Sequence, residues 1–327
     1  MTTSQHIVAL LQSHIAGDED RFLSIATQLA AHEARRGHGK LAQELRDLID
    51  SAKGKRQTVG RRGVGPVPLV QPKGELAGIL AARYSDLRLS SMVLSNDLAE
   101  RLGRVVKEQR QRERLRGRGL HPRRKLLLVG PPGSGKTMTA EALAGELKLP
   151  LFTVLYDGLI GKMMGETAAR LRLIFDAIAL QRGVYFFDEF DAIGSQRAGP
   201  NDVGEIRRVL NSFLTFLEQD DGLSLVIAAT NHPKLLDRAL GRRFDDVIPY
   251  SIPEAGVARG ILEARLVTFD LTSVNWDEVV AATKGLSQAE LARAADEAAK
   301  GAVLSDRERI SSNALLAAVA ERRTAAL

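Results

Sequence analysis

The hydrophobic positions at the start of the chain repeat with the spacing of a helix. Between residues 4 and 53, apolar side chains recur every three or four positions in blocks that the polar segments GDED and RRGHGK separate. Such a period places the apolar side chains on one helical face, so we expect a short N-terminal helical domain over residues 1–53. Residues 54–74 lack a period and are rich in glycine, proline and positive charge, which predicts a flexible basic linker.

After this linker the pattern changes, because short apolar runs alternate with stretches of helical period. A strand between two helical layers is apolar at every position, so the alternation predicts a parallel αβα sandwich over residues 75–252. Residues 253–327 show only helical period, which predicts a small all-helical lid domain. The strand-like runs are KLLLV at 125–129, LFTVL at 151–155, VYFF at 184–187, LVIAAT at 225–230 and DVIPY at 246–250.

The composition excludes several classes of protein. With 44% hydrophobic and 26% charged residues, the chain resembles ordinary soluble globular proteins. The absence of cysteine excludes disulfide frameworks, thiolate zinc sites and cysteine nucleophiles. No apolar run reaches the roughly 18 residues that span a bilayer, and the N-terminus lacks the positive start and cleavage pattern of a signal peptide. We therefore expect a cytoplasmic protein with no membrane partner.

The positive charge is concentrated in one strip. The formal net charge is +6, and eleven Lys or Arg residues against two Glu lie between Arg101 and Lys125. One interpretation is a solvated helix and loop that lead into the core. The other is a contact for nucleic acid or for an acidic partner, so nucleic acid stays open as a partner of the basic segments.

Residues 130–137 carry the strongest chemical signal in the sequence. They read GPPGSGKT, which satisfies the phosphate-loop pattern, and they lie between a predicted strand and a predicted helix. The pattern predicts that backbone N–H groups cradle the phosphates of ATP, that Lys136 reaches the outer phosphates, and that Thr137 binds Mg²⁺. The predicted nucleotide-binding residues of the loop are Gly130, Pro131, Pro132, Gly133, Ser134, Gly135, Lys136 and Thr137.

Two adjacent acids follow the apolar run at 184–187. A buried parallel strand would bring Asp188 to its carboxyl end, where it could bind Mg²⁺ through water, together with Thr137. Glu189 would then polarise the water that attacks the terminal phosphate. Strands often end in solvated acids, so this interpretation depends on the phosphate loop.

The segments around and after these acids resemble the AAA family. The resemblance is carried by FFDEFDAIGSQR at 186–197 and LVIAATNHPKLLDRALGRRFDD at 225–246, and it extends from about residue 95 to the end of the chain. It implies that Asn231 senses the terminal phosphate and helps to hold the attacking water. It also implies that Arg242 and Arg243 reach the nucleotide of a neighbouring subunit, so that hydrolysis requires a ring.

The chain departs from the family pattern at the two arginines and keeps a resemblance to it in the lid. Many relatives separate the two arginines, whereas here they are adjacent, as in the sub-group related to microtubule-severing and membrane-remodelling members. In the lid, GLSQAEL at 285–291 resembles the family stretch G-[FY]-S-G-A-[DE]-[IL], which implies that Gly285 and Ala289 lie near the nucleotide. No arginine occupies the position that distant relatives use as a second sensor.

A further segment of the family lines the central pore of the ring. It usually reads Lys, aromatic, hydrophobic, Gly, Glu, and here it reads Lys162, Met163, Met164, Gly165 and Glu166. Methionine can still contact varied peptide surfaces because its side chain is flexible and polarisable. The alternative is that these methionines belong to an ordinary core.

The resemblance implies an ATP-hydrolysing AAA motor that assembles into a ring of identical subunits, a hexamer, and remodels, unfolds or disassembles a protein substrate. We expect the substrate or an adaptor to bind the N-terminal domain. HEARR at His32 lacks the second histidine of a zinc protease, so any protease partner would be a separate chain. The alternative function is that of a nucleic-acid-associated helper in transposition or replication.

Overall fold

The computed structural model describes residues 71–160, 165–190, 203–232 and 241–325, and five isolated positions nearer the N-terminus. The chain divides into two compact units, Met1–Pro68 and Leu69–Leu327. Three of the isolated positions, Ala26, Leu29 and Ala30, are helical and buried. The remainder of the predicted N-terminal domain and most of the predicted linker lie outside the described residues, so the predicted domain boundaries stay predictions.

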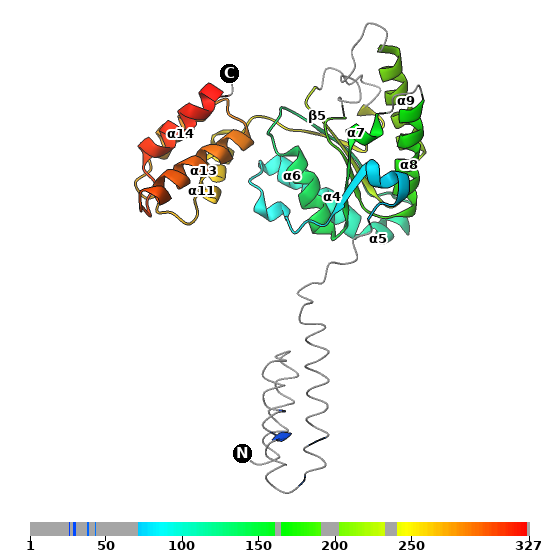
Figure 1. Cartoon of the computed structure of the whole chain (residues 1–327), viewed down its shortest axis with the longest axis horizontal. Helices are drawn as coiled ribbons and strands as arrows, with labels where there is room; N and C mark the ends of the chain where they lie inside the picture. Colours follow the sequence, from blue (N-terminus) through cyan, green and yellow to red (C-terminus); the bar gives the residue numbers. More distant parts are fainter. Residues whose placement is uncertain are drawn as a thin grey trace. The chain divides into compact units, whose positions relative to one another are not determined.

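The second unit contains a six-stranded sheet (Figure 1), and the predicted parallel arrangement is confirmed for all of its strands except one at the edge. All five predicted strands form and pair in parallel. The sequence did not predict a sixth strand, which pairs antiparallel with its neighbour at the edge of the sheet and is too short to show a clear period. The strands in sheet order are β1 (Leu80–Arg83), β3 (Leu151–Val154), β4 (Val184–Phe187), β5 (Leu225–Thr230), β2 (Lys125–Val129) and β6 (Asp246–Pro249).

Helices cover both faces of this sheet, as the alternating pattern predicts. Leu127 of β2 and Tyr185 of β4 belong to the core under α8 (Glu166–Leu180) and α9 (Val203–Gln219). Their neighbours along each strand point to the opposite face, into the core under α4 (Asn96–Arg110) and α6 (Lys136–Leu147). Each central strand is therefore buried on both faces, which explains its continuous apolar run. Shorter helical turns are η1 (Gly74–Gly78), η2 (Leu89–Ser91), α5 (Arg112–Arg116) and α7 (Tyr156–Leu159).

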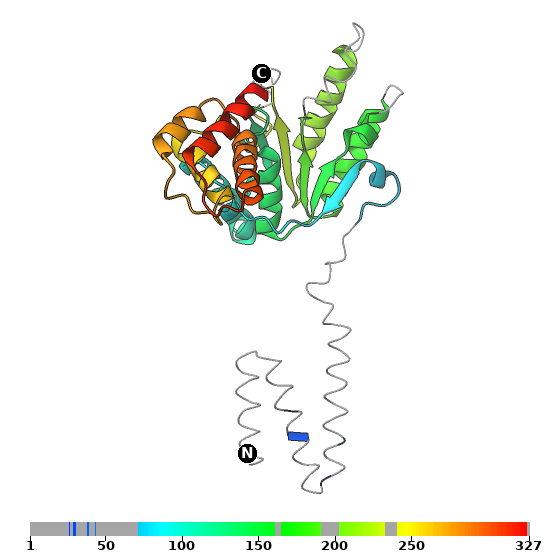
Figure 2. The ribbon, with the colours of Figure 1, turned by 60° about the vertical axis from the view of Figure 1, so that its left-hand side comes forward.

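The C-terminal part of this unit is a helical lid with a hydrophobic core of its own, which confirms the predicted all-helical character of this region. Figure 2 shows its helices, coloured yellow to red, as one bundle. A short parallel bridge between Asp270 and Arg309 joins the two loops of the bundle. None of the helices in the described part of the chain has the length and apolar character that a bilayer crossing requires. The lid helices are α11 (Ala255–Arg265), α12 (Trp276–Ala282), α13 (Gln288–Leu304) and α14 (Ser312–Ala325).

A cluster of aromatic rings supports the end of β4, immediately before the two predicted catalytic acids. The ring of Phe213 on α9 lies 4.9 Å from that of Phe187 and 4.4 Å from that of Phe190, centre to centre. Phe175 on α8 completes the cluster at 5.6 Å from Phe213. Since Phe187 and Phe190 flank Asp188 and Glu189 in the sequence, this packing fixes where the acids emerge from the sheet.

Replacing Phe213 by alanine should lower the free energy of unfolding by roughly 3–5 kcal/mol, because the side chain is completely buried and leaves a cavity. Phe216 lies on the same helix but is only half-buried, so Phe216→Ala is the matched control with a smaller loss. Urea denaturation of the two variants and the wild type measures both values. An equal or larger loss for Phe216→Ala would contradict the assignment of Phe213 as the centre of the cluster.

Candidate nucleotide site

The phosphate loop connects β2 to α6, and its glycines are required by its path. Gly133 and Gly135 have φ values of +70° and +92°, which side chains with a β-carbon rarely adopt. Gly130 lies so close to Tyr250, the residue that follows β6, that an added β-carbon would collide with the Tyr250 carbonyl oxygen. Behind the loop, the Tyr250 hydroxyl and the Thr139 hydroxyl of α6 form a buried hydrogen bond of 2.6 Å. The loop is therefore held from behind by both α6 and β6.

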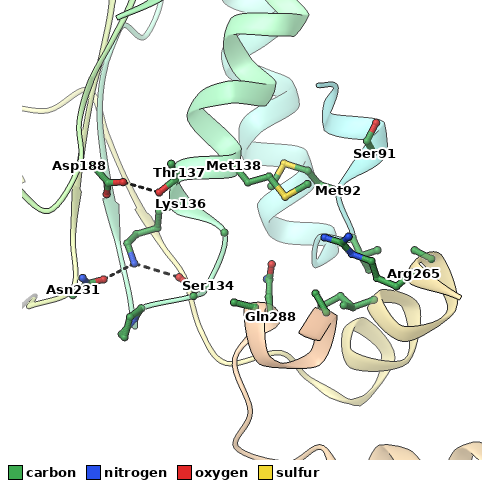
Figure 3. Close-up of a pocket in the computed structure, with 18 of the residues that line it drawn as sticks. Ser91, Met92, Ser134, Lys136, Thr137, Met138, Asp188, Asn231, Arg265 and Gln288 are labelled. Atoms are coloured by element: carbon green, nitrogen blue, oxygen red, sulfur yellow. Dashed lines mark hydrogen bonds between the residues drawn. The ribbon is translucent and has the colours of Figure 1, made fainter. Parts of the chain in front are cut away.

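Lys136, the first residue of α6, is buried and turned back over the loop. Its Nζ donates to the carbonyl oxygens of Gly130 and Pro131, each at 2.8 Å. It also donates to Asn231 Oδ1 at 2.8 Å, as Figure 3 shows. Asn231 follows β5, and β5 is the parallel neighbour of β2. The structure thus brings together two site residues that are 95 positions apart in the sequence.

Thr137 and Asp188, the predicted magnesium ligands, also meet. The Thr137 hydroxyl donates to Asp188 Oδ2 at 2.7 Å, which joins the first turn of α6 to the end of β4. One hydroxyl and one carboxylate form a donor set that suits Mg²⁺, since this ion usually keeps several waters and the oxygens of a bound phosphate. These two residues fit the ion that the sequence predicts.

Glu189 has an unusual backbone conformation for a residue with a side chain. Its φ is +47°, and its N–H donates to Asp188 Oδ1 at 3.0 Å. Residues held in the left-handed region cost about 1–3 kcal/mol and persist where the surroundings impose them. The Glu189 side chain is exposed, lines the same cavity as Lys136, and has no hydrogen-bond partner among the described residues. Its carboxylate is therefore available to a bound water.

These residues surround a cavity of about 660 Å³, a size that suits a nucleotide. Much of the other wall is formed by residues that the sequence analysis did not assign to the site, and they come from η2 and its surroundings, α6, α11 and α13. Most are apolar, as expected for a surface that receives a base, but no local motif marks them. The additional lining residues are Ser91, Met92, Val93, Met138, Ile261, Ala264, Arg265, Gln288 and Ala292.

The lid contacts the phosphate loop directly. The Ala289 N–H donates to the Gly133 carbonyl oxygen at 3.0 Å, and Ala289 lines the cavity as the resemblance implies. Ser287 and Glu290 form a reciprocal capping box at the start of α13, which fixes the position of this turn. Gly285 lies just before it with φ +93° and is not among the residues that line the cavity.

Arg242 and Arg243 lie outside this cavity, and their side chains have different surroundings. Arg243 Nε forms an ion pair of 2.6 Å with Glu218 Oε1 at the end of α9. Arg242 is exposed and has no ion-pair partner among the described residues. Neither arginine therefore lines the cavity that holds Lys136 and Asn231 in the described structure.

The predicted pore segment is only partly described. Lys162, Met163 and Met164 lie outside the described residues, so their role stays a prediction. Gly165 precedes α8 with φ +85°, which a glycine adopts without strain.

About half of the cations of the basic strip form ion pairs with carboxylates, some within the strip or on the same helix and some from other parts of the fold. Arg110, Arg123 and Arg124, for example, pair with Glu146, Glu108 and Asp220. This pattern favours a solvated surface, although nucleic-acid binding stays a prediction. Six of the eleven cations have a carboxylate partner, namely Arg101, Arg104, Arg110, Arg112, Arg123 and Arg124.

Comparison with known proteins relates most of the chain to one family. Residues 126–252 match the family described as the ATPase family associated with various cellular activities, AAA. A protein of Sinorhizobium fredii strain NGR234, described as the uncharacterized AAA family ATPase y4kL, is 33% identical over 312 residues. That alignment covers 95% of this chain and 92% of the relative.

Other relatives match part of their length. The ATP-dependent zinc metalloprotease FtsH 1 of Methylacidiphilum infernorum is 37% identical over 227 residues, which cover 67% of this chain and 36% of the metalloprotease. This chain therefore spans about a third of the length of that relative. The crystal structure of the FIGL-1 AAA domain superposes with a TM-score of 0.60 at 26% identity, covering 74% of this chain and 85% of that domain.

Replacing Lys136 by alanine should weaken ATP binding by about 10- to 100-fold, the equivalent of one lost charge-assisted hydrogen bond of roughly 1.5–3 kcal/mol. Titration with a fluorescent ATP analogue measures this change. Lys107→Ala removes the same charge from an exposed position on α4 and should leave the affinity unchanged. Equal affinities for the two variants would contradict a phosphate-binding role for Lys136.

Proposed function

Because this chain belongs to the AAA family of ATPases and is an ATP-hydrolysing enzyme, we propose that it works as a hexameric ring that remodels, unfolds or disassembles a protein substrate. The main support for the proposal is that the predicted site residues fall into two groups, one inside the cavity and one outside it. Lys136, Asn231 and Glu189 line one cavity, whereas Arg242 and Arg243 lie outside it. A site that lacks its arginines within one subunit can be completed by a neighbour.

We assign the binding of ATP to the phosphate loop and the lid. The backbone N–H groups of the loop and the N-terminus of α6 favour the negative phosphates, and Lys136 adds a positive charge between β2 and β5. Thr137 and Asp188 would hold Mg²⁺, which neutralises phosphate charge when bound. The apolar wall of Met92, Ile261 and the lid would receive the base.

In the hydrolytic step, Glu189 orients a water molecule and accepts its proton as the water oxygen attacks the terminal phosphorus. The bond from that phosphorus to the bridging oxygen breaks, so ADP and inorganic phosphate leave. Asn231 supports this step, because its Oδ1 is already bonded to Lys136 and its amide N–H groups remain to donate to the phosphate or the water. The exposed Glu189 side chain agrees with access by water.

Of the two arginines, we assign Arg242 to the neighbouring subunit's nucleotide. Its guanidinium is exposed, whereas Arg243 is held by Glu218 within the same subunit. A planar guanidinium that approaches the terminal phosphate stabilises the charge of the transition state. Arg243 and Glu218 would then fix the loop that presents Arg242.

The protein substrate is inferred from relatives. One of them is named as an ATP-dependent metalloprotease, and this chain matches about a third of it. We therefore propose that this chain supplies the ATP-driven step, that residues 1–53 bind the substrate or an adaptor, and that any protease is separately encoded. Stimulation of the ATPase by an unfolded polypeptide supports this proposal, whereas stimulation by DNA alone supports the nucleic-acid alternative.

Glu189→Gln should retain ATP binding and lower turnover by about 10²- to 10⁴-fold, the usual contribution of a general base. Phosphate release measures turnover, and light scattering after size exclusion with ATP and Mg²⁺ should find a stable assembly of about six subunits. Glu75→Gln makes the same change at an exposed position outside the cavity and should hydrolyse ATP normally. Normal turnover by the Glu189 variant would remove this residue from the role of base.

Arg242→Ala should lower turnover by about 10³-fold or more while nucleotide binding is retained, if the arginine acts across a subunit boundary. Mixing Arg242→Ala with Glu189→Gln should then restore part of the activity, because some interfaces combine an intact Glu189 with an intact Arg242. The control is Arg242→Ala mixed with a chain that carries both changes, which should stay inactive. Failure of the first mixture, with mixed assemblies verified by native mass spectrometry, would exclude hydrolysis in trans.

A further inference from the structure

Gln288 occupies a fixed position at the start of the lid's longest helix. It is the first residue of α13 and follows the N-cap residue Ser287, whose hydroxyl accepts from the Glu290 N–H. The Glu290 carboxylate accepts from the Ser287 N–H at 2.7 Å, which completes the capping box. With the adjacent Ala289 N–H bonded to Gly133, the backbone of Gln288 is held against the phosphate loop.

The side chain of Gln288 points from the lid toward this loop (Figure 3). A β-carbon added at Gly135 would stand 3.0 Å from Gln288 Oε1, so the carboxamide lies in contact with the loop. Gln288 is half-buried, lines the cavity, and makes no hydrogen bond through its carboxamide within the described part of the chain. A half-buried amide without a protein partner in a ligand cavity is available to a ligand.

We propose that Gln288 is a phosphate-contacting residue through which the lid detects the di- or triphosphate of the bound nucleotide. Its carboxamide can turn to donate N–H hydrogen bonds to phosphate oxygens held by the Gly135 segment of the loop. The inference rests on the nucleotide site of the proposed function. It also goes beyond the family resemblance, because the corresponding family stretch has glycine at this position and therefore offers no side chain there.

The charge distribution of the lid supports this assignment. Arg265 is the cation that the lid places in the cavity wall among the described residues, and Figure 3 shows it across the cavity from Asp188 and Asn231. Its nearest carboxylate partner is Asp296, at 3.9 Å. Next to the phosphate loop the lid therefore presents a neutral amide and no positive charge. A neutral donor binds a phosphate oxygen more weakly than a cation does, which allows the lid to separate from the loop after hydrolysis.

Gln288→Glu tests the proposal, because a carboxylate at this place should have opposite effects on folding and on binding. A negative charge in the first turn of α13 favours the helix, so the thermal unfolding temperature should be unchanged or higher. The same charge repels phosphates, so the Kd for ADP and for a non-hydrolysable ATP analogue should rise about tenfold. Gln288→Ala should raise both values about threefold, the effect of one lost neutral hydrogen bond.

Two controls separate a phosphate contact from a displaced lid. Asn313→Glu places the same carboxylate in the first turn of α14, outside the cavity, and should leave both Kd values unchanged. Adenosine, used as a competitor, lacks phosphates and should bind the Gln288 variants as well as it binds the wild type. If Gln288→Glu leaves both Kd values unchanged, or weakens adenosine binding as much as nucleotide binding, then the role of Gln288 is refuted while the nucleotide site stands. If the wild type binds none of these nucleotides, then both the nucleotide site and the role of Gln288 are refuted.

Discussion

The parallel pairing of β4, β5 and β2 is the constraint on which the nucleotide site depends. Parallel strands all end at the same edge, so Asp188, Asn231 and the phosphate loop emerge side by side although long segments separate them in the chain. The Lys136 ammonium then bridges two of these ends through Asn231 and the loop carbonyls. A slip of one strand by one residue would exchange the two faces of that strand and withdraw its polar group from this edge.

The aromatic packing behind β4 holds this arrangement rigid at Glu189, where the backbone conformation is strained. Phe187, Phe190 and Phe213 hold the segment in which Glu189 adopts a positive φ. Such a conformation is stable when the surrounding packing outweighs its cost. The core under α8 and α9 thus determines where the exposed carboxylate of Glu189, the proposed general base, stands.

The sequence predicts those parts of the fold and of the site that a short run of neighbouring residues marks by its composition or spacing. The central strands are apolar at every position because both faces are buried, and the phosphate loop is marked by its glycines. Strand β1 was missed because a short edge strand of four residues with one strongly buried position shows no period. The wall formed by Met92, Ile261 and Arg265 was missed because its residues come from separate segments, and their spacing reveals nothing about a shared cavity. The pairing of Arg243 with Glu218 likewise depends on tertiary contact, so adjacent arginines could not be distinguished beforehand.

The buried hydroxyl pair behind the phosphate loop has a consequence for the response of this enzyme to acidity. Burial raises the pKa of Tyr250 well above its usual value, so the phenol stays neutral across the physiological range. Its hydrogen bond to Thr139 therefore joins β6 to α6 without any group that titrates in that range. The rear support of the loop is insensitive to pH, so any physiological pH dependence of turnover must arise elsewhere, for example from the bound nucleotide or the groups in front of the cavity.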